Sequence, residues 1–275
     1  HYKIRNGNMR DIWEIYLNQV RKIDPQREVQ GLNWSVRVDV ANASAQILGG
    51  QLLSRGIDLV AISKENLFGS AQAFVTMIAC FINQIPVNVV DSVDAKPNAF
   101  SENQISGEEI SLVEVEKAHL KYSNHYEKDH DCGIALITSQ RIGGMTVTYE
   151  YSQLNFASAI AAFVQHLPEK NALTSGDIFQ VVIGDDIADA VGKILTTFVT
   201  GLRLQIYDSI DLDLSQATVL SASESQFSTF FRQCENKKPK SLVADLVSKI
   251  QVNLLSKGIF TQKDSKLRLI YLTRR

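Results

Sequence analysis

The sequence predicts an α/β protein in which parallel-rich sheets are sandwiched by helices in two similar lobes. Short apolar segments alternate with helix-patterned segments along most of the chain, which is the order of βαβ units. Several of these short segments are apolar at consecutive positions, as strands covered on both faces are. The composition, 45% hydrophobic and 21% charged, is that of an ordinary globular chain. We expect residues 1–132 to form the first lobe and residues 133–275 the second.

The first lobe opens with an amphipathic helix. Apolar residues recur at helical spacing from Met9 to Ile23, and Asp24-Pro25 ends the helix because proline disfavours helical backbone in the preceding residue. The next segments repeat the alternation: a helix over 40–53, a strand over 58–62, a helix over 67–81 and a strand over 86–91. This order predicts parallel strands joined by helices.

A polar connector is expected at residues 92–132. It is rich in Glu, Lys and Asn, and its periodic part, 105–122, predicts one solvated helix. Four potential metal ligands lie in it: His119, His125, His130 and Cys132. Their spacing fits none of the usual zinc signatures, so no metal site is predicted.

The second lobe begins with the most informative segment of the chain. We expect a strand over 133–138, a tight turn at Gly143-Gly144 and a helix over 151–167. The alternation then continues with a strand over 179–183, a helix over 186–199, a strand over 202–207, a helix over 242–254 and a strand over 267–272.

Composition excludes several classes of protein. A net charge of −2 and the lack of a basic patch argue against nucleic-acid binding. No apolar run is long enough for a transmembrane segment. The three cysteines form no CxxC pair, which favours reduced thiols and a cytoplasmic location. The chain lacks an initiator Met, and we expect it to be part of a larger multidomain protein.

Four segments resemble the large N-terminal domain of the acyl-adenylate-forming superfamily. They are Ala41–Asp91, Ala135–Thr148, Val181–Gly192 and Lys266–Thr273. Within the superfamily the sequence is most similar to fatty acyl-AMP ligase-like domains, including the divergent ones of eukaryotic disco-interacting proteins. The resemblance implies ATP and magnesium as cofactors and a fatty acyl or other lipid ligand. It also places the adenine-stacking residue and a mobile catalytic domain beyond residue 275.

The second segment occupies the place of the family's phosphate loop. Such loops work because glycines let backbone N–H groups approach the phosphates while hydroxyls and a lysine add donors and charge. The resemblance implies phosphate contacts from Thr138, Ser139, Arg141, Gly143, Gly144 and Thr146. However, Gln140 replaces a glycine and Thr146 stands at the lysine position. The alternatives are an ordinary turn kept for packing, or a nucleotide site in which Arg141 supplies the missing charge.

The third segment resembles the family's acyl and adenylate pocket. The resemblance assigns Asp185, Asp186 and Ile187 to this pocket, although Asp185 replaces the histidine that active fatty acyl-AMP ligases carry. Carboxylates that complement a helix dipole are the alternative explanation for these aspartates. An apolar face of the same helix also predicts room for a lipid; it consists of Ile187, Val191, Ile194 and Leu195.

Two functions follow from the resemblance. One is an acyl-AMP ligase or acyl-coenzyme A synthetase, which converts a fatty acid and ATP into acyl-AMP and pyrophosphate. The other is a pseudoenzyme that keeps the fold for lipid or partner binding. The altered phosphate loop, the missing histidine and the absence of a glycine pair after Leu272 favour the pseudoenzyme.

Overall fold

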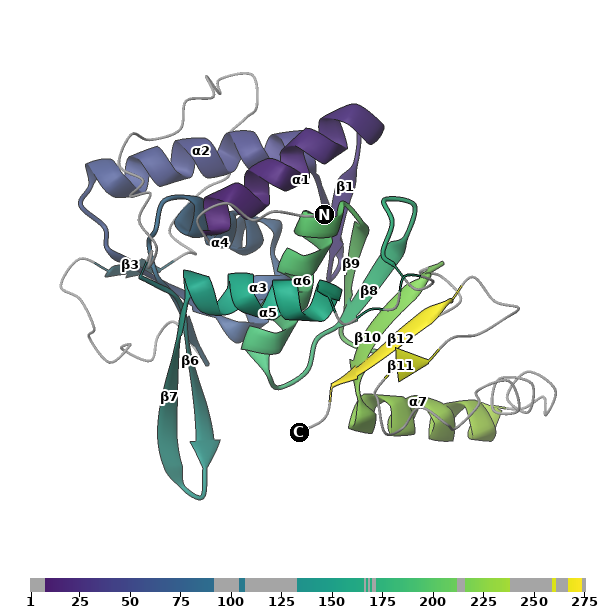
Figure 1. The fold of residues 1–275 in the computed structure, drawn as a ribbon. Helices are drawn as coiled ribbons and strands as arrows, with labels where there is room; N and C mark the ends of the chain where they lie inside the picture. The colour runs from purple at the N-terminus through teal and green to yellow at the C-terminus, as the bar shows by residue number, and fades with distance from the viewer. Residues whose placement is uncertain are drawn as a thin grey trace.

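The computed structural model describes residues 8–91, 104–106, 133–165, 167, 169, 172–211, 216–237, 259–260 and 267–273. It confirms the predicted α/β class, with helices flanking two mixed, mostly parallel sheets (Figure 1). The helices are α1 (Met9–Ile23), α2 (Val38–Ser54), α3 (Lys64–Gly69), α4 (Ala71–Ile82), α5 (Gln153–Gln165), α6 (Ile187–Thr200) and α7 (Glu224–Lys237). The strands are β1 (Glu28–Gly31), β2 (Trp34–Arg37), β3 (Leu59–Ser63), β4 (Val87–Val90), β5 (Gln104–Ser106), β6 (Ile134–Ile142), β7 (Met145–Ser152), β8 (Ile178–Val182), β9 (Arg203–Tyr207), β10 (Val219–Ser223), β11 (Ile259–Phe260) and β12 (Leu269–Thr273).

The two sheets do not divide the chain at Gly133. The larger sheet has the strand order β11-β12-β10-β8-β9-β1-β2, and the smaller has the order β5-β3-β4-β6-β7. Strands β6 and β7 follow Gly133 yet belong to the smaller sheet, because the apolar start of β6 pairs in parallel with β4. The β1–β2 hairpin precedes Gly133 yet joins the larger sheet through β9. Each sheet therefore contains strands from both sides of the expected boundary.

Helix α1 has the predicted bounds, and it packs against α2, α4 and α6. Asn8 caps it, accepting a hydrogen bond from the Asp11 backbone N–H at 2.8 Å. The buried Trp13 and Tyr16 pack on Phe198 of α6, with ring centroids 5.2 and 4.7 Å apart. Side chains from both sheets and the intervening helices form one main hydrophobic core.

The helix expected over 67–81 is two helices. Helix α3 ends at Gly69, and α4 begins at Ala71. Ser70 between them has extended backbone, and its hydroxyl accepts from the Ala73 backbone N–H, which caps the second helix. The periodic pattern continues across the break because both helices bury apolar side chains in the same core.

Some elements differ from the expectation or lie outside the described residues. Gln104–Ser106, at the start of the expected connector helix, form β5, parallel to β3. The rest of that segment and the expected helix over 242–254 lie outside the described residues. Six further elements have no counterpart in the prediction: β1, β2, β7, β10, α7 and β11.

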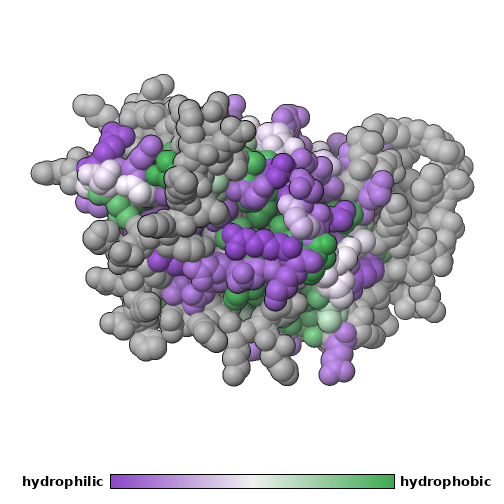
Figure 2. All heavy atoms as spheres, turned by 90° about the horizontal axis from the view of Figure 1, so that it is seen from above, coloured by the Kyte–Doolittle hydropathy of each residue, from purple (hydrophilic) through white to green (hydrophobic). Residues whose placement is uncertain are grey.

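The helices on the upper side of the molecule present a mainly polar surface. Figure 2 shows hydrophilic side chains over much of the described part of this face, with smaller hydrophobic areas between them. No helix in the described part of the chain is long and apolar enough to cross a bilayer.

Candidate functional site

Strands β6 and β7 form a hairpin where the sequence predicts a phosphate loop. The two strands pair from Ile134↔Ser152 to Ile142↔Met145, so the turn consists of Gly143 and Gly144 alone. Both glycines have positive φ, 57° and 85°, which a two-residue turn of this kind requires and which glycine adopts without strain. The hairpin projects from the body of the molecule (Figure 1). The expected order of strand, glycine loop and helix is therefore strand, turn, strand and then α5.

The residues predicted to contact phosphates are spread along this hairpin. Thr138 is 4% exposed and pairs with Val89 of β4, whereas Arg141 and Thr146 form an exposed pair, the second from the turn. The backbone from Thr138 to Gly143 is extended over about 17 Å, since a strand rises about 3.4 Å per residue.

Alternation in the strands also separates the side chains of this set. Arg141, Thr146 and Ser139 share one face of the hairpin, and the Ser139 hydroxyl lies 3.2 Å from that of Thr148 on the same face. Thr138 belongs to the opposite face, because successive side chains in a strand point to opposite sides. The structure thus brings Ser139, Arg141 and Thr146 to one face but places Thr138 away from them. It does not form a loop whose N–H groups converge on a phosphate.

The aspartates predicted for the acyl pocket lie where β8 leads into α6. Asp186 caps α6, its side chain accepting from the Asp189 backbone N–H at 3.0 Å. Asp185 is exposed, and Ile187 is buried in the core. The position of Asp186 agrees with the alternative in which these carboxylates complement the helix N-terminus.

The apolar face of α6 is packed in the hydrophobic core. All four of its residues belong to the main core and are at most 5% exposed: Ile187, Val191, Ile194 and Leu195. The periodicity that suggested space for a ligand instead marks the side of α6 that packs against the rest of the protein.

A cleft of about 240 Å³ lies on the other side of α6, facing α5. It is lined by Tyr151, Asn155, Phe156, Ala159, Phe163, Asp186, Ala188, Asp189, Gly192, Lys193 and Thr196. Asp186 is the one residue of the predicted site that lines it. The cleft combines aromatic rings with carboxylates, an amide and a lysine, so it favours a ligand that has both apolar and polar groups.

Lys193 is the buried cation of this cleft. It is 7% exposed, and its Nζ lies 2.7 Å from Asp189 Oδ1. The same ammonium lies 4.2 Å from the ring centroid of Tyr271 and 5.5 Å from that of Phe163, which is cation–π geometry. Thr273 donates to the other oxygen of Asp189 at 3.1 Å. These contacts tie α6 to α5 and to the end of β12.

Sequence reasoning missed Lys193. The available signal was its position four residues after Asp189, a spacing that also describes common surface pairs on helices. This pair differs from common surface pairs because the rings of Phe163 and Tyr271 contact the Lys193 ammonium. These two aromatic residues are far apart in the sequence.

Tyr151 connects the hairpin to the cleft. It is the last aromatic residue of β7 and lines the cleft with Asp186. Burial raises the pKa of its hydroxyl, and the negative charge of Asp186 acts in the same direction. Tyr151 is therefore a neutral hydrogen-bonding group at neutral pH.

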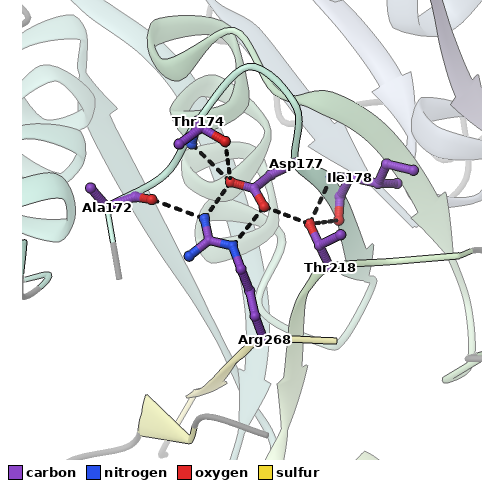
Figure 3. A network of polar contacts seen from close by, with 6 residues as sticks. All are labelled: Ala172, Thr174, Asp177, Ile178, Thr218 and Arg268. Carbon is purple, nitrogen blue, oxygen red and sulfur yellow. Dashed lines mark hydrogen bonds and ion pairs between the residues drawn. The ribbon is translucent and has the colours of Figure 1, made fainter. Parts of the chain in front are cut away.

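A second polar cluster joins the beginnings of three parallel strands. Asp177, just before β8, accepts from Thr174 N and Oγ1 at 2.8 and 3.0 Å and from Thr218 Oγ1 at 2.8 Å. Arg268, just before β12, donates to both of its carboxylate oxygens (Figure 3). Burial alone raises the pKa of Asp177, but these hydrogen bonds outweigh it and hold the pKa below its ordinary value. The cluster lies at the amino ends of the strands, away from the cleft.

The described residues contain no group of three or more potential ligands that could hold a metal ion. The predicted histidine-rich connector lies outside the described residues. Cys80 is a free thiol in the core, as expected for a reduced cysteine, and burial raises its pKa.

No family model matches the sequence, and no curated protein matches it. Many solved structures show the same architecture, and three of them illustrate the similarity. The N-terminal subdomain of Klebsiella oxytoca NpsA in complex with 3-hydroxybenzoyl-AMSN is 16% identical, with a TM-score of 0.59 over 84% of this chain and 63% of that one. Mycobacterium tuberculosis fatty acyl CoA synthetase is 10% identical, with a TM-score of 0.60 over 85% of this chain and 53% of that one.

The third is o-succinylbenzoate CoA synthetase (MenE) from Bacillus subtilis, a double mutant bound with a product analogue. It is 12% identical, with a TM-score of 0.57 over 82% of this chain and 52% of that one. The chain thus spans 52% to 63% of the length of these three structures. It has the fold of the N-terminal domain of adenylate-forming enzymes.

Proposed function

We propose that the chain is a divergent domain of the adenylate-forming type in which ATP-dependent activation is weakened or lost and a binding role is kept. The observation that carries this proposal is the β6–β7 hairpin. Its candidate phosphate-binding groups are distributed along two extended strands and over both faces of the hairpin, with Thr138 on the face opposite Arg141. A triphosphate needs donors that converge on it, and this set does not converge.

The charge at the hairpin supports the same conclusion. Thr146 stands where the family resemblance places a lysine, and a neutral hydroxyl forms a weaker hydrogen bond to phosphate than an ammonium does. Arg141 pairs with Thr146 across the hairpin but is exposed, so water competes for it and screens its charge. The residues present therefore do not fit ATP with magnesium.

The binding role is assigned to a partner or ligand with polar groups rather than to a fatty acyl chain enclosed by α6. The apolar face of α6 that would line an acyl tunnel is packed in the core, with Val191 and Ile194 fully buried. The cleft between α5 and α6 instead offers Asp186, Asn155 and Tyr151 beside aromatic rings.

Isothermal titration calorimetry with ATP and magnesium tests the proposal. We expect no detectable binding at millimolar ATP for the chain, and the same result for Arg141→Ala. Micromolar binding that disappears in Arg141→Ala but persists in Arg203→Ala, a matched change of an exposed arginine away from the hairpin, would contradict it. That outcome would support the alternative function, an active acyl-AMP ligase or acyl-coenzyme A synthetase in which Arg141 replaces the lysine.

A gain-of-function variant sharpens the experiment. Thr146→Lys restores an ammonium at the position where the resemblance places one. If the extended hairpin is the reason that ATP does not bind, Thr146→Lys alone will not create micromolar binding. Strong binding by this variant would show that a single charge, and not the geometry, was missing.

A further inference from the structure

Strand β7 is the longest edge strand of the two sheets in the described part of the chain. The edges of the sheets are formed by β11, β2, β5 and β7, which have 2, 4, 3 and 8 residues. Native proteins keep edge strands short or protect them with proline, lysine or a bulge, because an open edge pairs with other chains. β7 contains no proline or lysine, its single charged residue is Glu150, and the register shift in its ladder with β6 lies at the base of the hairpin, between Ile134 and Leu136. It therefore has the properties of an edge that is used for pairing.

The outer half of the hairpin has no third strand. β4 pairs with β6 only from Leu136 to Thr138, so β6 beyond Thr138 has β7 as its one partner among the described strands. A two-stranded hairpin is marginally stable by itself in water, and additional strands stabilise it. This hairpin is therefore well placed to gain stability from another strand.

The side chains of β7 alternate strictly. Met145, Val147, Tyr149 and Tyr151 belong to one face, and Thr146, Thr148, Glu150 and Ser152 belong to the other. The apolar face is not fully covered, since Met145 is 70% exposed and Tyr149 is 37% exposed. Ile142, which pairs with Met145 across the turn, is 49% exposed. An apolar stripe of this kind on a projecting hairpin is typical of a contact surface.

The register shows which backbone groups point to the open edge. In a two-residue hairpin the pair that flanks the turn, here Ile142 and Met145, exchanges hydrogen bonds, and the bonded and non-bonded pairs then alternate. The residues of β7 in non-bonded pairs are Thr146, Thr148 and Glu150. Their N–H and C=O groups therefore face away from β6 and are oriented to pair with another strand.

We propose that β7 pairs antiparallel with β7 of a second copy of this chain, with the two-fold axis at Thr148. In this register each Thr148 faces Thr148 of the other copy, Thr146 faces Glu150 and Val147 faces Tyr149. The strand is thus self-complementary, as a two-fold interface requires. Aromatic and β-branched residues form favourable cross-strand pairs, and no two like charges are opposed.

Other two-fold registers are less favourable. The axis can lie at a residue whose backbone faces the open edge, which is Thr146, Thr148 or Glu150, or at a residue between them, Val147 or Tyr149. An axis at Val147 or Tyr149 would pair only two of the three outward residues with each other. An axis at Glu150 would place two carboxylates opposite each other, which is destabilising. An axis at Thr146 would overlap only the end of the strand next to the turn. The axis at Thr148 uses the outward backbone groups of all three residues in both copies.

Sedimentation equilibrium of the whole chain tests the proposal. We expect the unaltered protein to show the mass of two 30.6-kDa chains at high concentration. Thr148→Pro removes the N–H at the axis but no bond to β6, so we expect it to weaken dimerisation at least about tenfold. Thr148→Ala keeps the N–H and is the matched control, for which we expect a dimer. Circular dichroism establishes that each variant is folded.

A charge exchange at the axis identifies the register. Thr148→Lys and Thr148→Glu each place two like charges opposite each other, so each variant alone is expected to be a monomer. An equimolar mixture of the two is expected to form a dimer again. A monomeric unaltered protein at all concentrations would overturn the proposal, as would a dimer that these changes do not affect.

Discussion

The β6–β7 hairpin and the cluster around Asp177 use the same residue types in opposite ways. Each contains an arginine and threonine hydroxyls. Around Asp177, donors from three separate segments converge on one buried carboxylate (Figure 3). On the hairpin, Arg141 and Thr146 lie on an extended ladder and are exposed to solvent. The difference shows that donor groups form a site when the backbone directs them to one point, and that residue types alone do not predict this.

The position of the two regions in the sheets explains the contrast. Asp177, Thr218 and Arg268 precede β8, β10 and β12, which are neighbouring parallel strands, so their side chains begin at the same edge of the larger sheet. The hairpin continues beyond the smaller sheet, where β4 no longer accompanies β6. Neighbouring strands supply partners in the first region and not in the second.

The largest expected effect is a difference in stability between two arginine variants, Arg268→Ala and Arg141→Ala. Arg268→Ala removes the partner of a buried carboxylate, and breaking such a pair costs about 3 kcal/mol of the free energy of unfolding. Arg141→Ala changes an exposed side chain and is expected to cost less than about 0.5 kcal/mol. Urea unfolding of both variants measures the difference. Equal losses would show that the hairpin arginine has a structural partner comparable to Asp177.

A smaller loss is expected at Lys193. Lys193→Met keeps most of the aliphatic stem but removes the ion pair with Asp189 and the cation–π contact with Tyr271, with an expected cost of about 2 kcal/mol. Lys64→Met is the control, because Lys64 pairs with an exposed Asp91 and its loss is expected to cost well under about 1 kcal/mol. A Lys193 variant as stable as the Lys64 variant would mean that the buried ion pair makes no net contribution.

The pH dependence of stability tests the charge of Asp177. Its pKa in the folded protein is below its ordinary value, so its contribution to stability is present above the pKa of an unfolded aspartate, about 3.9, and is lost as the pH falls further. We expect Asp177→Asn to be less stable than the unaltered protein at pH 7. The gap between the two should narrow in acid, because protonation removes the same charge. Urea unfolding at pH values from 7 to 2 measures this gap, and a constant gap would contradict the prediction.

The sequence predicted the buried parallel strands and the regular helices well. Apolar runs gave β3, β4 and β8 to within one or two residues, and the periodicity of α1 predicted both of its ends. β7 was missed because its alternation follows a Gly-Gly turn that we interpreted as a phosphate loop, and because an exposed strand lacks an apolar run. The break at Ser70 was missed because the helices on both sides bury apolar faces.

The candidate site was harder to predict than the fold. Asp186 was singled out because a motif surrounds it; it lines the cleft, and its assignment to an acyl pocket stays a prediction. The buried environment of Lys193 is formed by the rings of Phe163 and Tyr271, which lie far from each other in the sequence. The Asp177–Arg268 pair likewise joins residues 91 positions apart. Contacts between distant segments leave no local pattern in one sequence. They follow from the order of the strands, which only the structure specifies.

The smallest expected effect concerns the hairpin turn and compares two glycines under the same change. Gly144 has φ 85°, a conformation that costs a residue with a Cβ about 1 kcal/mol, so Gly144→Ala is expected to destabilise the protein by about that amount. Gly50 lies within α2, and a methyl group on its Cα would meet no atom within 4 Å, so Gly50→Ala is expected to stabilise the protein by about 0.5–1 kcal/mol. Thermal unfolding of the two variants should therefore shift in opposite directions. A shift of Gly144→Ala in the same direction as Gly50→Ala would mean that the turn does not hold positive φ in solution, and the register that places Thr148 at the open edge of β7 would have to change with it.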